Sequence, residues 1–200
     1  MSEKSKLRVV LWRHGQTDWN VENRYQGHSD IPLNKVGQYQ VGHAAKVLAG
    51  MNPNRIIASD LIRAKQTAQA LVDLTGIKLE IDPDLRETNG GNWEGKTGQQ
   101  NREEDGERFK QWMFGEDVKA GEIGESRSEV AKRARSAIER GIAEATGTII
   151  FVTHGGTSRA LLGSILDMPF DKWATLGGLS NASWSVLEPN SFTKIGWTLV

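Results

Sequence analysis

Short, nearly continuous apolar runs alternate along this chain with longer segments whose apolar residues recur at the period of a helix. A continuous apolar run predicts a strand buried on both faces, which is typical of parallel sheets. Strands that alternate with helices indicate an α/β fold on a mainly parallel sheet. The expected strands span residues 7–12, 55–58, 77–81, 148–152, 182–187 and 195–199.

Capping residues mark where the expected helices begin. Asn34 can accept a hydrogen bond from the first turn of one helix, and Ser59 is expected to cap the next. Ser126 and Glu129 stand three residues apart and form the pattern of a capping box. The expected helices cover about 34–49, 59–76, 126–142 and 157–166.

Residues 83–124 interrupt this alternation of strands and helices. The segment is rich in glycine and charge and contains the aromatic residues Trp93, Phe109, Trp112 and Phe114. With 200 residues, the chain is long enough for one full domain and short for two. We expect a single domain over the whole chain, with an insertion at about 83–124 that contains some helix.

Composition narrows the range of partners and of chemistry. The 25 Lys and Arg residues balance the 25 Asp and Glu residues, which gives no electrostatic reason to expect nucleic acid or an anionic membrane as partner. The absence of cysteine excludes disulfides, thiolate metal sites and cysteine nucleophiles. Residues 1–8 contain no apolar run of signal-peptide length, so a cytoplasmic enzyme or binding protein is expected.

Two of the four histidines end expected strands and precede glycine. His14 follows the first strand and His154 follows the fourth. Ligands of open α/β sheets bind outside the carboxyl ends of the strands, so these side chains are expected to face a ligand. A lone histidine would more often be structural, but two at matching strand ends favour a functional site. The glycine pair after His154 leads into a helix, whose first amides can bind an anion.

Charged residues follow the strands at the same edge of the expected sheet. Arg13 precedes His14, and Arg63 falls in the first turn of the helix after the second strand. A guanidinium suits phosphate because it donates two parallel hydrogen bonds. Glu87 follows the third strand and could protonate a departing oxygen as a general acid. Taken alone, Arg63 and Glu87 are more typical of solvated surface than of a site, and it is the position of Arg63 at the sheet edge that favours a functional role.

At these residues the chain resembles the histidine phosphatase superfamily, also called the phosphoglycerate mutase-like family. Residues 13–20 read RHGQTDWN and resemble the family motif RHGxTxxN. Further blocks with similar sequences occur in the family order and cover nearly the whole chain. They are SDLIRAKQTA at 59–68, LRE at 85–87 with GNWEG at 91–95, GES at 124–126 and THGG at 153–156.

The resemblance implies a three-layer α/β/α sandwich around a mostly parallel six-stranded sheet. It implies a phosphomonoesterase in which His14 is the nucleophile and is transiently phosphorylated, without a metal or another cofactor. Glu87 would donate and accept the proton. The residues implied to hold the phosphoryl oxygens are Arg13, Arg63 and His154, and those implied to bind substrate are Asn20, Gln26, Gly27 and Gly155.

The family contains mutases and phosphatases, and the loop after Glu87 resembles the phosphatases. A cofactor-dependent phosphoglycerate mutase, a broad-specificity phosphatase and a catalytically silent binding protein stay open as alternatives. The segment LGGLSNASW at 176–184 resembles the glucosyl-3-phosphoglycerate phosphatases within the family. The expected partner is a small phosphorylated substrate, with a homodimer as an open possibility.

Selectivity for one substrate is expected to come from residues around the leaving group. A tryptophan face can stack on a sugar ring, and a cationic pocket favours a substrate that also carries a carboxylate. These features point to a glycosylated phosphoglycerate, although aromatic residues serve packing equally often. The candidates are Gln26, His28, Trp93, Trp112 and Phe114.

Overall fold

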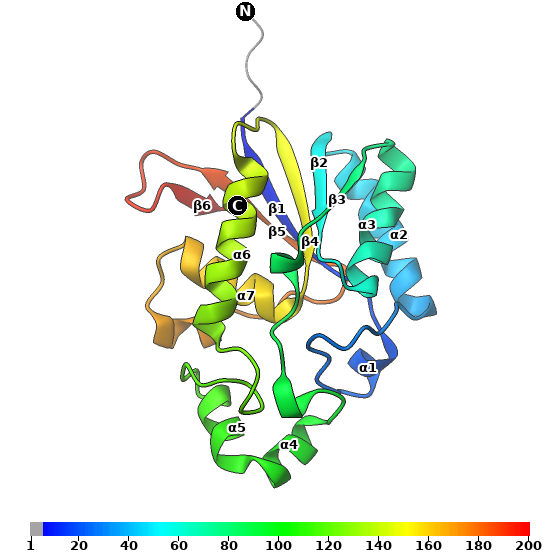
Figure 1. Cartoon of the computed structure of the whole chain (residues 1–200). Helices are drawn as coiled ribbons and strands as arrows, with labels where there is room; N and C mark the ends of the chain where they lie inside the picture. The colour runs from blue at the N-terminus through cyan, green and yellow to red at the C-terminus, as the bar shows by residue number, and fades with distance from the viewer. Residues whose placement is uncertain (1–5) are drawn as a thin grey trace, which may run out of the picture.

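The computed structural model describes residues 6–200, in which helices flank a central sheet (Figure 1). The prediction that residues 1–8 contain no apolar run of signal-peptide length falls in part on residues 1–5. These five residues lie outside the described part of the chain. Within residues 6–200, six strands pair in the order β3-β2-β4-β1-β5-β6. They are β1 (Arg8–Arg13), β2 (Pro53–Ala58), β3 (Leu79–Ile81), β4 (Thr148–Thr153), β5 (Trp184–Pro189) and β6 (Trp197–Leu199).

The sheet is mixed, which corrects the expectation of a mostly parallel one. Strands β1 to β4 pair in parallel, whereas β5 runs antiparallel to β1, and β6 runs antiparallel to β5. The chain reaches β5 at the carboxyl end of β1, where the amide of Ala182 donates to the carbonyl of His14 at 3.0 Å. From that point β5 can pair with β1 only by running in the opposite direction.

The helices confirm most of the expected starts and stops. The Asn34 side chain caps the second helix, and the capping box of Ser126 and Glu129 is present. Ser59 does not cap the third helix, which begins at Ile62, and the amide of Ile62 donates instead to Asp30 at 2.6 Å. The helices are α1 (Asp18–Val21), α2 (Lys35–Ala49), α3 (Ile62–Thr75), α4 (Gly98–Glu104), α5 (Gly106–Met113), α6 (Arg127–Ile142) and α7 (Gly155–Ile165), with short 3₁₀ turns at Pro83–Leu85, Gly91–Trp93 and Phe170–Thr175.

Alternate residues of the central strands divide the core between two faces of the sheet. On one face, Val10 and Trp12 of β1 pack with α2 and α3. On the other, Val9 and Leu11 pack with α6 and α7. Successive side chains of a strand point to opposite faces, so the continuous apolar run of β1 supplies both layers. Helices therefore cover both faces of the sheet, as Figure 1 shows.

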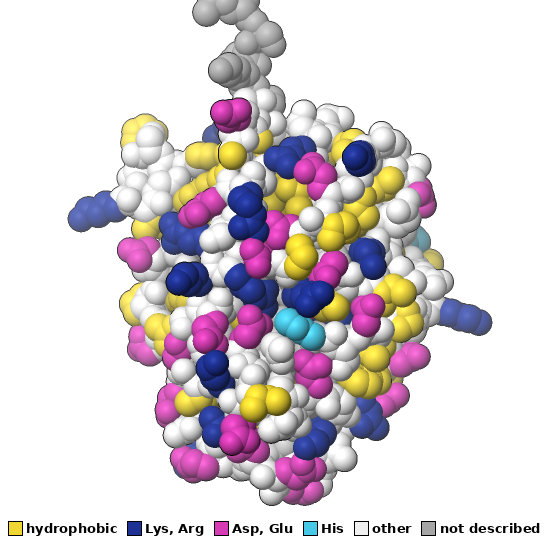
Figure 2. All heavy atoms as spheres, viewed as in Figure 1, with side chains coloured by type: hydrophobic (Ala, Val, Ile, Leu, Met, Phe, Trp, Pro, Cys, Tyr) yellow, Lys and Arg dark blue, Asp and Glu magenta, His cyan; other side chains and the backbone are white. Residues whose placement is uncertain are grey.

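Residues 83–124 build a small apolar cluster of their own beyond the carboxyl ends of the parallel strands. Helices α4 and α5 lie at that end of the molecule (Figure 1). Trp93 is the centre of the cluster, with edge contacts to Phe109 and Trp112 at ring distances of 5.4 and 5.7 Å. On the face in Figure 2, cationic and anionic side chains are interspersed, in keeping with the balanced composition. None of the helices in residues 6–200 is both long and apolar enough to cross a membrane.

Candidate active site

Two histidines from neighbouring parallel strands meet at the carboxyl edge of the sheet. His14 directly follows β1 and His154 directly follows β4, and these two strands are paired. The imidazole rings lie 5.2 Å apart, and both side chains are buried. The sequence prediction that both would face one site is consistent with this placement, because parallel neighbours end side by side.

The ring of His14 is oriented for attack by its distal nitrogen. Nδ1 donates to the carbonyl of Gly15 at 2.7 Å, so the proton is placed on Nδ1, and Nε2 keeps its lone pair. Burial lowers the pKa of His14 well below its usual value, and the charges of Arg63 and Arg13 lower it further. His14 is therefore a neutral base at physiological pH.

Arg63 and His154 lie beside His14. Arg63 supplies a positive charge there, and hydrogen bonds hold its guanidinium in place. Arg63 Nε donates to His154 Nδ1 at 3.2 Å, and its terminal nitrogens donate to the carbonyls of Ser29 and Gly27 at 2.8 and 2.7 Å. His154 Nδ1 is thus an acceptor and Nε2 carries the proton, yet Nε2 is buried without a partner among residues 6–200. Burial lowers the pKa of Arg63 to about 10, which leaves it charged at neutral pH.

Arg13 adds a second guanidinium, and only some of its N–H groups have a hydrogen-bond acceptor in the protein. One terminal nitrogen donates to the carbonyl of Leu179 at 2.5 Å. Its Nε is buried and has no partner within the described part of the chain. A buried donor without a partner is costly, so a site that collects two of them is suited to an oxyanion.

Glu87 is held by the beginning of α7. Its Oε2 accepts from the amide of Gly156 at 3.0 Å, and its Oε1 accepts from the amides of Thr157 and Thr88 at 3.0 and 2.8 Å. The sequence predicts that these first amides of the helix can bind a ligand anion, but in the structure they donate to the Glu87 carboxylate instead. Position 156 requires glycine, because a Cβ there would lie 2.6 Å from Glu87 Oε1.

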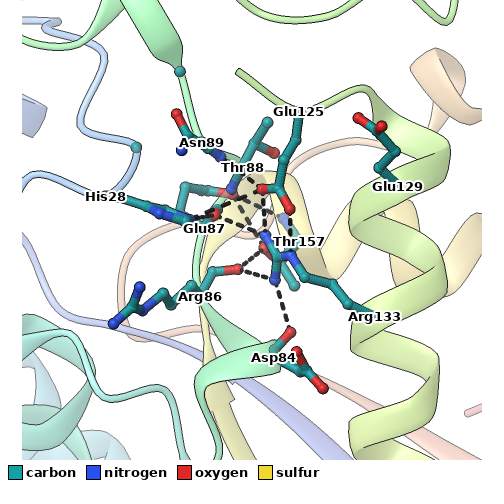
Figure 3. A network of polar contacts seen from close by, with 12 residues as sticks. His28, Asp84, Arg86, Glu87, Thr88, Asn89, Glu125, Glu129, Arg133 and Thr157 are labelled. Atoms are coloured by element: carbon teal, nitrogen blue, oxygen red, sulfur yellow. Dashed lines mark hydrogen bonds and ion pairs between the residues drawn. The ribbon is translucent and has the colours of Figure 1, made fainter. Parts of the chain in front are cut away.

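Arg133 of α6 binds the backbone of the loop that carries Glu87, which we call the acid loop (Figure 3). It donates to the carbonyls of Asp84, Arg86 and Glu87 at 2.7 to 2.8 Å. It also forms two hydrogen bonds with Glu125, at 2.7 and 2.8 Å. One side chain therefore fixes three carbonyls of the segment that carries Glu87.

Two further contacts tie the same loop to its neighbours. Glu125 Oε2 accepts from the amide of Asn89 at 2.8 Å, and His28 Nε2 donates to the carbonyl of Glu87 at 2.9 Å (Figure 3). These bonds hold the loop on both sides of Glu87. Apart from the GES block, which contains Glu125, no sequence pattern predicted this arrangement, because the backbone partners of Arg133 come from another segment.

Arg133→Met is expected to lower the free energy of unfolding by about 3 kcal/mol, because it leaves Glu125 and three carbonyls without their donor. The Arg133 and Glu125 side chains are only 16% and 23% exposed, so solvent replaces little of what is lost. Chemical denaturation measures the change. Arg140→Met is the control, because this exposed ion pair with Asp82 and Asp84 should contribute less than about 1 kcal/mol. Equal effects of the two substitutions would contradict the role of Arg133.

A cavity of about 230 Å³ opens above these residues. It brings together most of the residues implied by the resemblance, which are Arg13, His14, Asn20, Gln26, Gly27, Arg63 and Glu87. His154 and Gly155 do not line it. His154 lies beneath Arg63, and Gly155 gives space to Arg13, since a Cβ there would lie 3.3 Å from the guanidinium.

The loop after β1 is fixed by its own hydrogen bonds. Thr17 Oγ1 donates to Gln26 Oε1 at 3.0 Å, and Asn20 Oδ1 accepts from Asn181 at 3.1 Å. The Asn181 side chain also donates to the carbonyl of His14 at 3.3 Å. The segment 176–184 therefore lies against the site and helps to orient its polar rim.

The aromatic candidates for substrate recognition separate in the structure. Trp112 lines the cavity, whereas Trp93 is 1% exposed and donates to Asp105 within its own apolar cluster. Phe114 is 72% exposed and lies outside the cavity lining, as does His28. The interpretation of Trp93 as a ligand platform is wrong, because burial leaves its ring without an accessible face.

Several lining residues were absent from the sequence interpretation. Arg127 begins α6 and Arg159 lies one turn into α7, which places both near the helix starts that surround the cavity. Their positions in the first turn of α6 and the second turn of α7 could have predicted that they lie near the site, because α7 begins at the same sheet edge as His154. The other additional lining residues are Arg24, Tyr25, Thr88 and Ala160.

No cluster of three or more metal-ligating side chains occurs among residues 6–200. The arrangement can perform phosphoryl chemistry with side chains alone: a free imidazole nitrogen, fixed cations around it and a carboxyl group at the rim. Fixed cations stabilise the charge that develops on phosphoryl oxygens.

Comparison with known proteins gives consistent matches over most of the chain. The profile of the histidine phosphatase superfamily (branch 1) matches residues 9–199. Glucosyl-3-phosphoglycerate phosphatase of Mycobacterium tuberculosis is 39% identical, over 96% of this chain and 92% of the relative. A solved structure of mycobacterial glucosyl-3-phosphoglycerate phosphatase in complex with VO3 has a TM-score of 0.88 at 38% identity, covering 96% of both chains. The protein named "Probable phosphoglycerate mutase GpmB" of Yersinia enterocolitica is 36% identical over 82% of this chain and 76% of its own length.

Proposed function

The chain belongs to the histidine phosphatase superfamily and is a phosphoric monoester hydrolase, and we propose that it acts through a phosphohistidine at His14 on a glycosylated phosphoglycerate. The proposed substrate is glucosyl-3-phosphoglycerate or a related phosphorylated acid. One observation carries the mechanism. The ring of His14, whose Nε2 is unprotonated, lies 5.2 Å from the ring of His154, and the buried N–H groups at His154 Nε2 and Arg13 Nε have no partner among residues 6–200.

In the first step, the lone pair of His14 Nε2 attacks phosphorus and forms the N–P bond. The bond from phosphorus to the leaving oxygen breaks, and a protonated Glu87 gives its proton to that oxygen. The negative charge on the three equatorial oxygens is balanced by Arg13 and Arg63 and by the N–H of His154. Asn20, Gln26 and Gly27 border the leaving group, and Gly155 lets Arg13 approach.

In the second step, water attacks the phosphorus and Glu87 accepts its proton. The N–P bond breaks, phosphate is released, and His14 returns to its neutral form. The histidine thus divides one difficult displacement into two easier ones. No metal enters either step, because the protein cations balance the charge. We further propose that the chain acts in the cytoplasm as one domain, with the insertion at about 83–124 forming one wall of the cavity.

Three observations support the substrate assignment. The segment 176–184, which resembles the glucosyl-3-phosphoglycerate phosphatases, lies against the site through Leu179 and Asn181. Trp112 lines the cavity and gives it an apolar surface that a sugar can contact. The 39% identity to a relative of that name over most of both chains points the same way.

We expect kcat/KM for glucosyl-3-phosphoglycerate to exceed that for 3-phosphoglycerate by at least about tenfold, which corresponds to roughly 1.4 kcal/mol of differential transition-state binding. Steady-state phosphate release with both substrates measures the ratio, and an unrelated sugar phosphate serves as control. Equal turnover of the three compounds would leave only the general phosphatase activity.

A phosphoglycerate mutase is the second candidate, because the likeness to the Yersinia enterocolitica protein extends over 82% of this chain. The products formed from 3-phosphoglycerate distinguish the phosphatase from the mutase. Incubation with 3-phosphoglycerate, followed by phosphorus NMR, should give inorganic phosphate. Accumulation of 2-phosphoglycerate without phosphate release would favour the mutase instead.

A further inference from the structure

The cavity continues beyond the phosphoryl site along the starts of α6 and α7, where two further arginines lie. Arg127 is the first residue of α6, and Arg159 is the fifth residue of α7. Both line the same cavity as His14 and Glu87. The mechanism proposed above uses neither of them.

Arg127 is held in place by an aromatic ring and forms no ion pair among residues 6–200, although the charge of Asp117 acts on it from beyond ion-pair distance. Its guanidinium carbon lies 3.9 Å from the centre of the Trp112 ring, which also lines the cavity. Its only hydrogen bond to residues 6–200 is a long one, 3.4 Å, to the carbonyl of Glu116. Partial burial lowers the pKa of Arg127 to about 10, although it stays charged at neutral pH. Stacking on Trp112 fixes the plane of the guanidinium and leaves its edge free to donate.

Arg159 links Arg127 to the phosphoryl site. Its Nε is buried and has no partner among the described residues, and it forms no ion pair there. The charge of Arg159 lowers the pKa of both Arg13 and Arg127, after the larger effect of burial in each case, so the three guanidinium groups lie close enough to repel one another. Such repulsion is relieved when an anion lies between the cations.

The charges that line the cavity leave this pair uncompensated. Five arginines line it, whereas Glu87 is the one carboxylate among the lining residues. Both oxygens of Glu87 already accept amide hydrogen bonds. Of the five arginines, Arg24 has a counter-charge in Glu22. In the proposed mechanism Arg13 and Arg63 bind the phosphoryl group. Arg127 and Arg159 therefore have no anionic partner among the lining residues and are available to bind a second anion.

We propose that Arg127 and Arg159 form a carboxylate-binding subsite, which makes the enzyme selective for phosphorylated acids over phosphorylated alcohols and sugars. This inference rests on the phosphatase activity proposed above and specifies the substrate class. A guanidinium pair suits a carboxylate, because each can donate parallel hydrogen bonds to its oxygens. The phosphoryl group itself belongs at the other end of the cavity, because the nucleophile His14 lies there.

The test compares two substrates that differ only in the second anion. 3-Phosphoglycerate carries a carboxylate where sn-glycerol 3-phosphate carries a hydroxymethyl group. The parent enzyme should prefer the acid in kcat/KM. In Arg127→Met and Arg159→Met, kcat/KM for the acid should fall about 10- to 100-fold, the factor expected for a hydrogen bond to a charged group, while kcat/KM for the alcohol stays within about threefold.

Arg135→Met is the matched control, because it removes one positive charge from the exposed side of the same helix, where Arg135 pairs with Glu139. It should leave both substrates unchanged. Thermal unfolding reports folding separately, and neither cavity variant should lose stability, since each removes an unpaired cation. If Arg127→Met and Arg159→Met lower kcat/KM for both substrates equally, or if the parent enzyme shows no preference for the acid, the subsite is wrong. Failure of the parent enzyme to release phosphate from either substrate and from an aryl phosphate would instead overturn the proposed mechanism.

Discussion

His14→Ala is expected to abolish phosphate release while leaving the protein folded. The substitution removes the atom that forms the N–P bond in the proposed mechanism, the free Nε2 of His14. In nucleophilic enzymes the loss of the nucleophile removes most of the rate enhancement, on the order of 10⁶-fold in kcat. The remaining cations would still bind phosphate, so affinity for inorganic phosphate should persist.

Two measurements check this result. Rapid quenching of the parent enzyme with substrate should trap phosphate on His14 in a form that is acid-labile and base-stable, and mass spectrometry locates it. His43→Ala is the control, because His43 is exposed on α2, where it contacts Tyr39 and is not among the residues that line the cavity. Full activity of the His14→Ala protein, or phosphate trapped at another residue, would refute the mechanism.

Glu87→Gln should slow hydrolysis of alkyl phosphates by about 10²- to 10⁴-fold, the usual contribution of general acid–base catalysis. An alkoxide is a poor leaving group and needs the proton that glutamine cannot give. An aryl phosphate leaves as a more stable anion, so its hydrolysis should be affected much less. Initial rates of both substrate classes on both proteins give the comparison.

The environment of Glu87 makes the aryl substrate a necessary part of this experiment. The carboxylate accepts amide hydrogen bonds on both oxygens, from Gly156 and Thr157 among others. A glutamine would place its NH₂ group against one of these donors and shift the start of α7. Equal loss on alkyl and aryl phosphates would therefore assign Glu87 a positioning role and exclude proton donation. Glu103→Gln, on the exposed face of α4, controls for the loss of a surface charge.

Local sequence patterns determined the elements that carry the site. The apolar run of β1 specifies a strand buried on both faces, because its alternate residues face two helical layers. The capping box at Ser126 specifies the start of α6, because its bonds join residues three apart. The positions of His14 and His154 at strand ends follow from the same local patterns. Interactions within a few residues of the chain suffice for each of these predictions.

Tertiary packing alone decided the direction of β5 and the surroundings of each charged group. The antiparallel β5 depends on where the chain returns to β1, which no local pattern of residues encodes. Trp93 and Trp112 are both aromatic residues of the insertion, yet the first is packed into its interior and the second lines the cavity. Likewise, the amides of α7 bind Glu87 rather than substrate, because the acid loop is brought against them by Arg133. Charge, burial and hydrogen bonding depend on partners distant in sequence, so the chemistry of Glu87, Arg127 and Arg159 became visible only in the folded chain.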